Sequence, residues 1–347
     1  MMGRVDLRSL DKNEILEWVV SKGEKPYRAA QIFEWLHKRM AGSPEEMNNV
    51  PKSLKTALEN DFEFSFARED MRQESQVDGT KKFLFELCDG ERIESVFMKY
   101  RSWNSVCISS QAGCNMGCSF CASTIGGLSR NLTAGEMLSQ VYEIQRLLSE
   151  KVSRIVVMGS GEPLENYDNL LKFIRLITDE DGQALSMRNI TVSTCGIVEK
   201  IEELSRENLK FNLAISLHAP TDEKRKQIMP VALRYSLEEL IGACRNYFDR
   251  TGRQLTFEYA LIDGFNNSQE DVLALAGLLE GLNCVINLIP VNPVRDRSFK
   301  EPGNRAVREF KAALEKRRLN VTVRREMGRD IDGACGQLRA RRKKAEG

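Results

Sequence analysis

The sequence predicts an α/β protein whose main part is an open, partial (β/α)6 barrel of the TIM type, preceded by a small helical domain and a short β meander. Six β-rich runs, from SVCISSQ at residue 105 to VINLIPVN at residue 285, are each followed by a segment with helical spacing of its apolar residues. Ahead of these runs, the spacing changes near residue 62 from helical to alternating. Because eight such units close a full barrel, six predict a barrel with an open side.

The elements follow in the order helices, meander, barrel. Helical spacing is found in ILEWVV, AAQIFEWLHKRM and LKTALEND, which predicts an N-terminal accessory domain. Alternation follows in MRQESQV, KKFLFEL and RIESVFMKY, which are joined at Asp78-Gly79 and Asp89-Gly90 and predict antiparallel strands. NVTVRRE, near the end, predicts an additional barrel strand. The expected boundaries are 1–62 for the helical domain, 63–100 for the meander, 101–326 for the barrel and 327–347 for a C-terminal loop and basic tail.

The net charge of the 347 residues is only +1, but the charge is unevenly distributed. Residues 291–347 contain 17 Lys or Arg against 8 Asp or Glu, so this part of the chain could contact phosphates. A solvated helix face followed by a basic tail is the alternative. A second basic set near the N-terminus consists of Lys25, Arg28, His37, Lys38, Arg39, Lys52 and Lys55.

The composition indicates a cytoplasmic protein without a membrane partner. No segment stays apolar over the roughly 20 residues that a membrane-spanning helix needs, and the first residues do not follow the signal-peptide pattern. In the reducing cytosol, nine cysteines do not predict a disulfide framework. Cysteines that cluster therefore indicate metal or redox chemistry.

Three cysteines follow the first barrel strand with the spacing C-x-x-x-C-x-x-C, in QAGCNMGCSFCAS. Loops at this end of the strands build the active site of a barrel. A structural zinc site takes four protein ligands, whereas Cys114, Cys118 and Cys121 have no fourth cysteine nearby. Three thiolates can hold three irons of a 4Fe-4S cluster and leave the fourth iron open. A structural zinc site is the alternative.

This spacing at this position resembles the radical S-adenosylmethionine superfamily, in which that nucleotide chelates the fourth iron. Ser160-Gly161-Glu162-Pro163, after the second strand, is similar to the GGEP loop of the superfamily. Five segments in order resemble the RlmN and Cfr family of ribosomal RNA adenine methyltransferases: CNMGCSFCASTIGGLSRNLTAGE, MGSGEPLEN, ISLHAPTDEKR, NLIPVNP and DIDGACGQL. Ser160 departs from the family, which commonly has Met there. CAST and GGLSRNLT resemble the RlmN branch, which methylates carbon 2 of adenine, rather than the carbon-8 branch.

The resemblance implies a 4Fe-4S cluster on the three cysteines, S-adenosylmethionine as cofactor, and RNA as substrate. The implied targets are an adenosine of 23S rRNA at the peptidyl-transferase centre and an adenosine in the anticodon loop of certain tRNAs. We further expect a reducing electron donor such as flavodoxin and a monomeric enzyme. The alternatives are a carbon-8 methyltransferase of the Cfr type and a non-enzymatic RNA-binding protein with a structural metal site. The residues that the resemblance assigns to S-adenosylmethionine are Gly161, Glu162, Ser193, Ser216, Leu217, His218 and Asn292.

Three further residues are candidate catalytic groups. Cys335 lies between glycines in GACGQ, which is a poor setting for a core residue and a suitable one for a nucleophile. The resemblance implies that one S-adenosylmethionine methylates Cys335. It also implies that a 5'-deoxyadenosyl radical from a second S-adenosylmethionine takes a hydrogen atom from that methyl group, whose carbon then adds to RNA.

Glu94 shares a strand face with Val96 and Met98, which predicts a desolvated base for the ring proton. An edge-strand carboxylate in a salt bridge is the alternative. Cys107 is predicted to face the lumen, and product release fits its attack on the Cys335 sulfur, which leaves a disulfide bond. The remaining cysteines are expected to be structural: Cys88, Cys195, Cys244 and Cys284.

Overall fold

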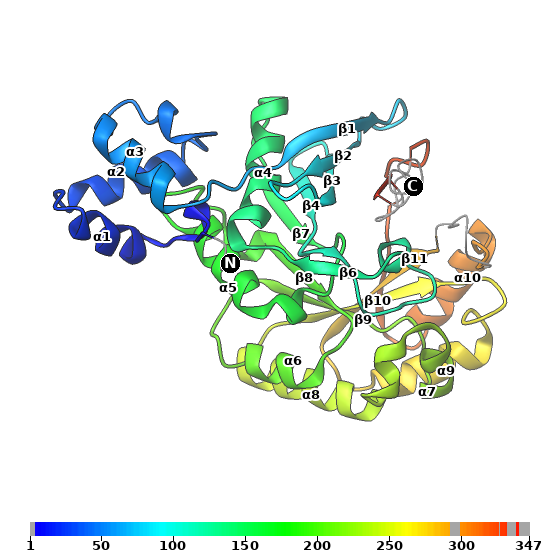
Figure 1. Ribbon diagram of the computed structural model, residues 1–347. Coiled ribbons are helices and arrows are strands. Elements are labelled where there is room, and N and C mark those ends of the chain that lie inside the picture. Colours follow the sequence, from blue (N-terminus) through cyan, green and yellow to red (C-terminus); the bar gives the residue numbers. More distant parts are fainter. Residues whose placement is uncertain (1–3, 292–298, 326, 332–337, 340–347) are drawn as a thin grey trace.

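A mixed sheet runs through the centre of the molecule, and helices cover its outer side (Figure 1). The structure, a computed structural model, describes residues 4–291, 299–325, 327–331 and 338–339. Within these residues one sheet contains ten strands, in the order β1-β2-β3-β4-β7-β8-β9-β10-β11-β12. This arrangement confirms the predicted α/β class and the open, barrel-like architecture.

The parallel part of the sheet contains all six strands expected for the barrel. Neighbouring strands from β4 to β12 pair in parallel, and helices cover them, so their sequences are rich in Val, Ile and Leu. The additional strand expected in NVTVRRE also forms, next to β11. The parallel strands are β4 (Asn104–Ile108), β7 (Arg154–Val157), β8 (Ile190–Thr194), β9 (Asn212–Ser216), β10 (Leu255–Leu261), β11 (Cys284–Pro290) and β12 (Asn320–Val323).

The three meander strands belong to the same sheet. They are antiparallel to one another, and β3 also pairs antiparallel with β4, so the meander extends the barrel sheet. Its two Asp-Gly turns place Gly79 at φ 73° and Gly90 at φ 84°, the conformation for which glycine is favoured. A separate two-stranded ribbon, β5 with β6, flanks the cysteine loop. These strands are β1 (Arg68–Glu74), β2 (Lys81–Glu86), β3 (Arg92–Lys99), β5 (Gln111–Gly113) and β6 (Leu128–Asn131).

The helices between the parallel strands form an outer layer (Figure 1). Thr133 and Glu136 form a capping box at the start of the first of them, which fixes where the chain turns back along the sheet. None of the helices in the described ranges is both long and apolar enough to cross a lipid bilayer. The outer helices are α4 (Ala134–Leu148), α5 (Tyr167–Thr178), α6 (Val198–Leu204), α7 (Asp222–Ile228), α8 (Leu237–Thr251), α9 (Gln269–Leu278) and α10 (Asn304–Glu315).

The N-terminal helices are joined to α4 through a buried arginine. Arg8 is fully buried and donates to Ser139 Oγ on α4 at 2.8 Å and to the Ala41 carbonyl oxygen at 2.6 Å. Its guanidinium group also lies 4.8 Å from the centroid of the Phe64 ring. The N-terminal helices and the barrel therefore share a hydrogen-bonded core. These helices are α1 (Lys12–Ser21), α2 (Tyr27–His37) and α3 (Lys52–Asp61).

His37, counted above in the basic N-terminal set, contributes no surface charge, because it is completely buried. Its Nδ1 lies 3.0 Å from the Tyr142 hydroxyl, and its ring centroid lies 4.5 Å from that of Phe33. Burial lowers the pKa of His37 to about 3, so the ring is neutral at physiological pH. The basic surface of the N-terminal helices consists of lysines and arginines alone.

The burial of His37 predicts a specific pH dependence of stability. Because its folded pKa of about 3 lies below the unfolded value of about 6.5, stability is lost as the pH falls from about 6.5 toward 3. Relative to His37→Gln, the wild-type protein should therefore lose about 1.4 kcal/mol of unfolding free energy per pH unit within that window. Urea unfolding between pH 7 and pH 4.5 measures this difference. Arg39→Gln, at an exposed position, should give a curve parallel to wild type, and a parallel curve for His37→Gln would contradict the prediction.

Candidate active site

The loop that carries the three cysteines starts at a hydrogen-bonded junction after β4. Ser109 is fully buried, and two hydrogen bonds join its backbone to Gln140 of α4: its N–H donates to Oε1 at 2.8 Å, and its carbonyl oxygen accepts from Nε2 at 2.9 Å. The Ser109 hydroxyl donates to the Glu94 carbonyl oxygen at 2.7 Å and accepts from the Ser160 N–H at 3.0 Å. One serine therefore fixes β3, β4, α4 and the turn after β7 relative to one another.

Cys114, Cys118 and Cys121 line one cavity of about 260 Å³. Burial raises the pKa of the Cys114 thiol to about 12 and raises that of Cys118 as well, so these thiols need the charge of a bound metal to ionise. In the part of the chain that the structure describes, no three His, Cys, Asp or Glu side chains are arranged to hold a single metal ion. Three thiols around one cavity match the three cysteine ligands of a 4Fe-4S cluster whose fourth iron is open.

Two glycines allow the loops of the site to approach each other closely. Gly113 has φ 92°, and a Cβ on it would lie 2.0 Å from the Gly127 carbonyl oxygen. Gly161 has φ 112°, and a Cβ there would lie 2.6 Å from the Gln111 Cβ. Both positions combine a backbone conformation that L residues avoid with a lack of space, so only glycine fits.

Glu162 is buried at the turn after β7 and lies beside the cysteine cavity. Its Oε1 accepts from the Leu164 N–H at 2.9 Å, and its Oε2 accepts from the Cys195 N–H at 2.7 Å. Burial raises the pKa of the Glu162 carboxyl group in spite of these bonds. The side chain thereby joins the turn after β7 to the turn after β8.

Three further residues expected at S-adenosylmethionine also line this cavity: Ser193, Ser216 and His218. The two serine Oγ atoms lie 3.3 Å apart. His218 Nδ1 accepts from the Ala260 N–H at 2.9 Å, and burial lowers the His218 pKa to about 3, so the ring is neutral and its proton is on Nε2. The site therefore contains one fixed imidazole donor. Leu217 differs, because its side chain is fully buried in the apolar core rather than in the cavity wall.

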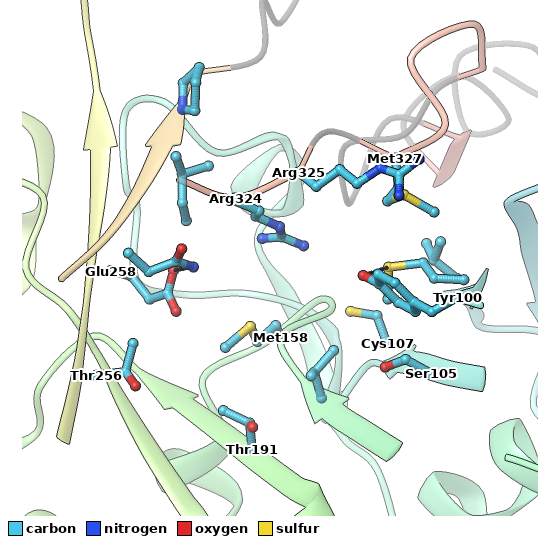
Figure 2. Close-up of a pocket in the computed structure, with 16 residues that line it drawn as sticks. Tyr100, Ser105, Cys107, Met158, Thr191, Thr256, Glu258, Arg324, Arg325 and Met327 are labelled. Carbon is cyan, nitrogen blue, oxygen red and sulfur yellow. Dashed lines mark hydrogen bonds between the residues drawn. The ribbon is translucent and has the colours of Figure 1, made fainter. Parts of the chain in front are cut away.

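A second cavity, of about 470 Å³, adjoins the first (Figure 2). Figure 2 shows Cys107 of β4 and Glu258 of β10 on opposite sides of it, with Met158 between them. Cys107 is buried and packs with Val96 and Met98 of β3. The cavities share part of their wall, so a group near the three cysteines and a group near Cys107 would be neighbours. The residues that line both cavities are Met158, Glu258, Ile289 and Arg324.

Glu94 is buried and forms an internal ion pair. β3 lies between β2 and β4 in the sheet, so the edge-strand alternative is wrong about the strand, although the salt bridge it expected is present. Glu94 Oε2 lies 2.9 Å from Nζ of Lys82, whose side chain is also fully buried. Glu94 Oε1 accepts from the Arg339 N–H at 2.8 Å. The carboxylate therefore connects the meander to the C-terminal segment.

Cys335 lies outside the described residues, but the chain is bound to the meander on both sides of it. Before it, the Asp330 carboxylate accepts from the Ser75 hydroxyl at 2.5 Å, in the turn between β1 and β2. After it, Arg339 Nη2 lies 3.0 Å from Glu91 Oε2, in the turn between β2 and β3. The meander therefore holds the segments that flank Cys335.

Sequence reasoning missed three charged residues around the site: Lys82, Arg225 and Glu258. Arg225 on α7 is fully buried and donates to the Cys195 carbonyl oxygen at 2.6 Å. Lys82 and Glu258 lie within the strand segments KKFLFEL and QLTFEYALI. A charged residue among the apolar residues of a strand was the signal that could have identified them. Asn292, which was expected at the cofactor, lies outside the described residues.

Two family models match the chain. The radical SAM superfamily matches residues 108–276, which include β7 to β10 and the cysteine loop. The ribosomal RNA large subunit methyltransferase N-terminal domain matches residues 5–64, which include α1 to α3. Together the two matches cover the helical region and most of the barrel.

Curated relatives match over nearly the whole chain. The probable dual-specificity RNA methyltransferase RlmN of Lachnospira eligens is 53% identical over 334 residues, which are 96% of this chain and 95% of that protein. The protein of the same name from Geobacillus kaustophilus is 48% identical over 341 residues, 97% of this chain and 93% of that protein. Among solved structures, a radical SAM methyltransferase from Sphaerobacter thermophilus has a TM-score of 0.92 and 41% identity, and the match covers 96% of this chain and 98% of that one.

The three loop cysteines predict the iron content of the protein. Cys114→Ala, Cys118→Ala and Cys121→Ala should each reduce bound iron from about four atoms per chain to below about one, because two thiolates retain the cluster poorly. Iron analysis after anaerobic reconstitution measures this. Cys88→Ser, at an exposed site, should keep its iron and brown absorbance. Four irons retained in all three alanine variants would show that these cysteines are not the ligands.

Proposed function

This chain belongs to the RlmN family of radical S-adenosylmethionine RNA methyltransferases, and we propose that it methylates carbon 2 of adenine in 23S rRNA and in the anticodon loop of some tRNAs. As a member of this family it is an enzyme that uses S-adenosylmethionine and a 4Fe-4S cluster. The pair of adjoining cavities carries the proposal, because three cysteines line one and Cys107 lines the other. The first suits the cluster and the nucleotide cofactor, and the second suits a target base at the peptidyl-transferase centre or in the anticodon loop.

In this proposal the cysteine cavity holds the cofactors. Cys114, Cys118 and Cys121 would hold three irons of the cluster and leave the fourth iron to S-adenosylmethionine. When bound, the cluster would supply the electron for cleavage of S-adenosylmethionine and would take one electron back later in the reaction. Glu162 and His218 line this cavity; the Glu162 carboxyl group would accept a hydrogen bond from the methionine amino group, and His218 Nε2–H would donate to a cofactor acceptor. Backbone groups at Gly161, the Ser193 and Ser216 hydroxyls, Leu217 and Asn292 complete the proposed set.

The chemistry of the target carbon explains why a radical route is needed. Carbon 2 of adenine is electron-poor and carries no acidic proton, so no ordinary base can convert it into a nucleophile toward a sulfonium methyl group. A carbon-centred radical can add to such a carbon directly. The target base must also leave its stack to enter a buried cavity, which loops of rRNA and tRNA allow.

We assign the methyl carrier to Cys335 and the release step to Cys107. The methyl group on the Cys335 sulfur would lose a hydrogen atom to the 5'-deoxyadenosyl radical, and its carbon would then form a bond to carbon 2 of adenine. The adduct then loses one electron and the proton of carbon 2. The Cys107 thiolate attacks the Cys335 sulfur, the S–S bond forms, the S–CH2 bond breaks, and the carbon takes a proton to become the new methyl group. Cellular thiols reduce the disulfide before the next turnover.

Glu94 is the proposed acceptor of the proton from carbon 2. Both of its oxygens are engaged, one by Lys82 and the other by the Arg339 N–H. Each oxygen keeps a second lone pair, which can accept the proton. Lys82, on the neighbouring strand, holds the carboxylate in position independently of the C-terminal segment.

The carbon-8 reaction of the Cfr type is the second candidate activity. Mass spectrometry of digested RNA, with 2-methyladenosine and 8-methyladenosine standards, distinguishes the two reactions. The family argues against the remaining alternative, a non-enzymatic RNA-binding protein. A reducing donor such as flavodoxin and a monomeric state complete the proposal.

The proposed roles of the two cysteines predict different products when each is removed. Cys335→Ala should give neither methylated protein nor a covalent RNA adduct, because the methyl carrier is missing. Cys107→Ala should still accept the methyl group and add to RNA, and should then accumulate as a covalent protein–RNA complex. Denaturing gels of protein expressed in cells, with and without ribonuclease, measure the adduct.

Cys88→Ser serves as the control and should turn over without an adduct, because Cys88 lines neither cavity. An adduct in Cys335→Ala, or full turnover in Cys107→Ala, would refute these roles and leave the cluster assignment untouched.

The exposed basic residues of the N-terminal helices predict salt-dependent RNA binding. The triple variant Lys25→Gln, Lys38→Gln, Lys52→Gln should bind RNA more weakly. The slope of log affinity against log salt concentration should become less steep by about 0.7–0.9 for each phosphate that a lysine no longer neutralises. S-adenosylmethionine binding should not change. Lys226→Gln, an exposed lysine on α7, is the matched control. An unchanged salt slope in the triple variant would remove the N-terminal helices from the RNA interface.

A further inference from the structure

Glu258 has no role in the reaction described so far, yet it lies in the wall shared by the two cavities. Its side chain is on β10 and is 5% exposed. Figure 2 shows its carboxyl group pointing into the second cavity, opposite Cys107. A buried acidic group that faces a cavity is unfavourable unless it meets a hydrogen-bonding partner.

Glu258 belongs to a row of polar residues at one level of the sheet. The register pairs Ser216 with Glu258, Glu258 with Asn287, and Asn287 with Thr322 on four successive strands. Asn287 Nδ2 donates to Glu258 Oε2 at 2.9 Å, while Asn287 Oδ1 accepts from the Thr322 hydroxyl at 3.0 Å. Asn287 is thus held from both sides, and it fixes the direction in which the Glu258 carboxyl group points.

The Glu258 carboxyl group has capacity for further hydrogen bonds. Among the described residues, Asn287 is its one hydrogen-bond partner. Burial raises the pKa of Glu258, and the charge of Arg324 only partly offsets this effect. A protonated carboxyl group presents an acceptor oxygen and an O–H donor side by side.

The rest of the second cavity has the features of a nucleotide site. The Tyr100 ring lines it, and aromatic rings stack on bases that are extruded from RNA. Arg324 and Arg325 are exposed where β12 ends and also line the cavity, at a place suited to phosphates. Cys107, assigned above to product release, must lie beside the modified base.

We propose that Glu258 recognises the target adenine, by accepting a hydrogen bond from its 6-amino group and donating one to its N1. This inference rests on the proposed function and adds to it the residue that selects the base. N1 is bonded to carbon 2, so a hydrogen bond to N1 also withdraws electron density from the carbon that the methylene group attacks. One contact would then both select adenine and prepare it for addition.

Two substitutions, Glu258→Gln and Glu258→Met, distinguish hydrogen bonding to adenine from other roles that the Glu258 carboxyl group could have. Glu258→Gln keeps one acceptor and one donor side by side, the pair with which an amide recognises adenine. Glu258→Met keeps the approximate size and removes both. The substrates are two anticodon stem-loop RNAs, one with adenine at the target position and one with purine, which lacks the 6-amino group. Glu280→Gln, an exposed glutamate, is the control.

Single-turnover methylation with the cluster-containing full chain gives the expected pattern. With adenine RNA, Glu258→Gln should retain the wild-type rate within about threefold, and Glu258→Met should lose about tenfold or more, the effect of a buried hydrogen bond left unmade. With purine RNA, the difference between Glu258→Met and wild type should shrink to about threefold or less. An equal loss in Gln and Met would mean that the ionised carboxylate is needed, which overturns the proposal.

A second measurement separates target recognition from cofactor binding and from the proposed function itself. Methylation of Cys335, followed by intact-protein mass spectrometry without RNA, needs S-adenosylmethionine alone. Glu258→Met should methylate Cys335 at the wild-type rate. A tenfold slower methylation would assign Glu258 to the cofactor ribose and overturn the proposal. Absence of Cys335 methylation in the wild-type protein would instead refute the proposed function.

Discussion

The hydrogen bonds between Ser109 and Gln140 fix the position of the backbone at which the cysteine loop leaves the sheet, and the other parts of the site depend on that position. Ser109 is where the antiparallel meander, the parallel barrel and the cysteine loop meet, and Gln140 bonds both of its backbone groups from α4. Since the Ser109 hydroxyl also bonds Glu94 and Ser160, the proposed base and the turn that carries Gly161 are set by one residue. A buried amide is expensive to leave without a partner, so this junction constrains four elements at once.

Glu94 and Glu258 are both buried, but their carboxyl groups have different partners. Glu94 is paired with Lys82 and accepts a hydrogen bond from the C-terminal segment. Glu258 has one amide partner and a cavity in front of it, and burial raises its pKa. The roles proposed for the two residues differ in the same way: Glu94 accepts a proton, and Glu258 recognises a neutral base.

The sequence predicts those features that depend on local spacing. The parallel strands, the extra strand β12, the meander and the cysteine loop all follow from periodicity within about ten residues or from a motif. The ion pair between Lys82 and Glu94 depends on the register between β2 and β3, which pairs Leu84 with Glu94 and places Lys82 diagonally across. Leu217 shows a similar limit, because a motif names a residue without saying whether its side chain or its backbone meets the cavity.

The open sheet also has a consequence for behaviour in a concentrated solution. A closed barrel has no free strand edges, whereas this sheet ends at β1 and at β12 within the described residues. β1 has the sequence REDMRQE, so another strand that tried to pair with it would have to align and dehydrate five charged side chains. β12 is only four residues long and is followed directly by two arginines. The charge at both edges of the open sheet thus discourages edge-to-edge aggregation.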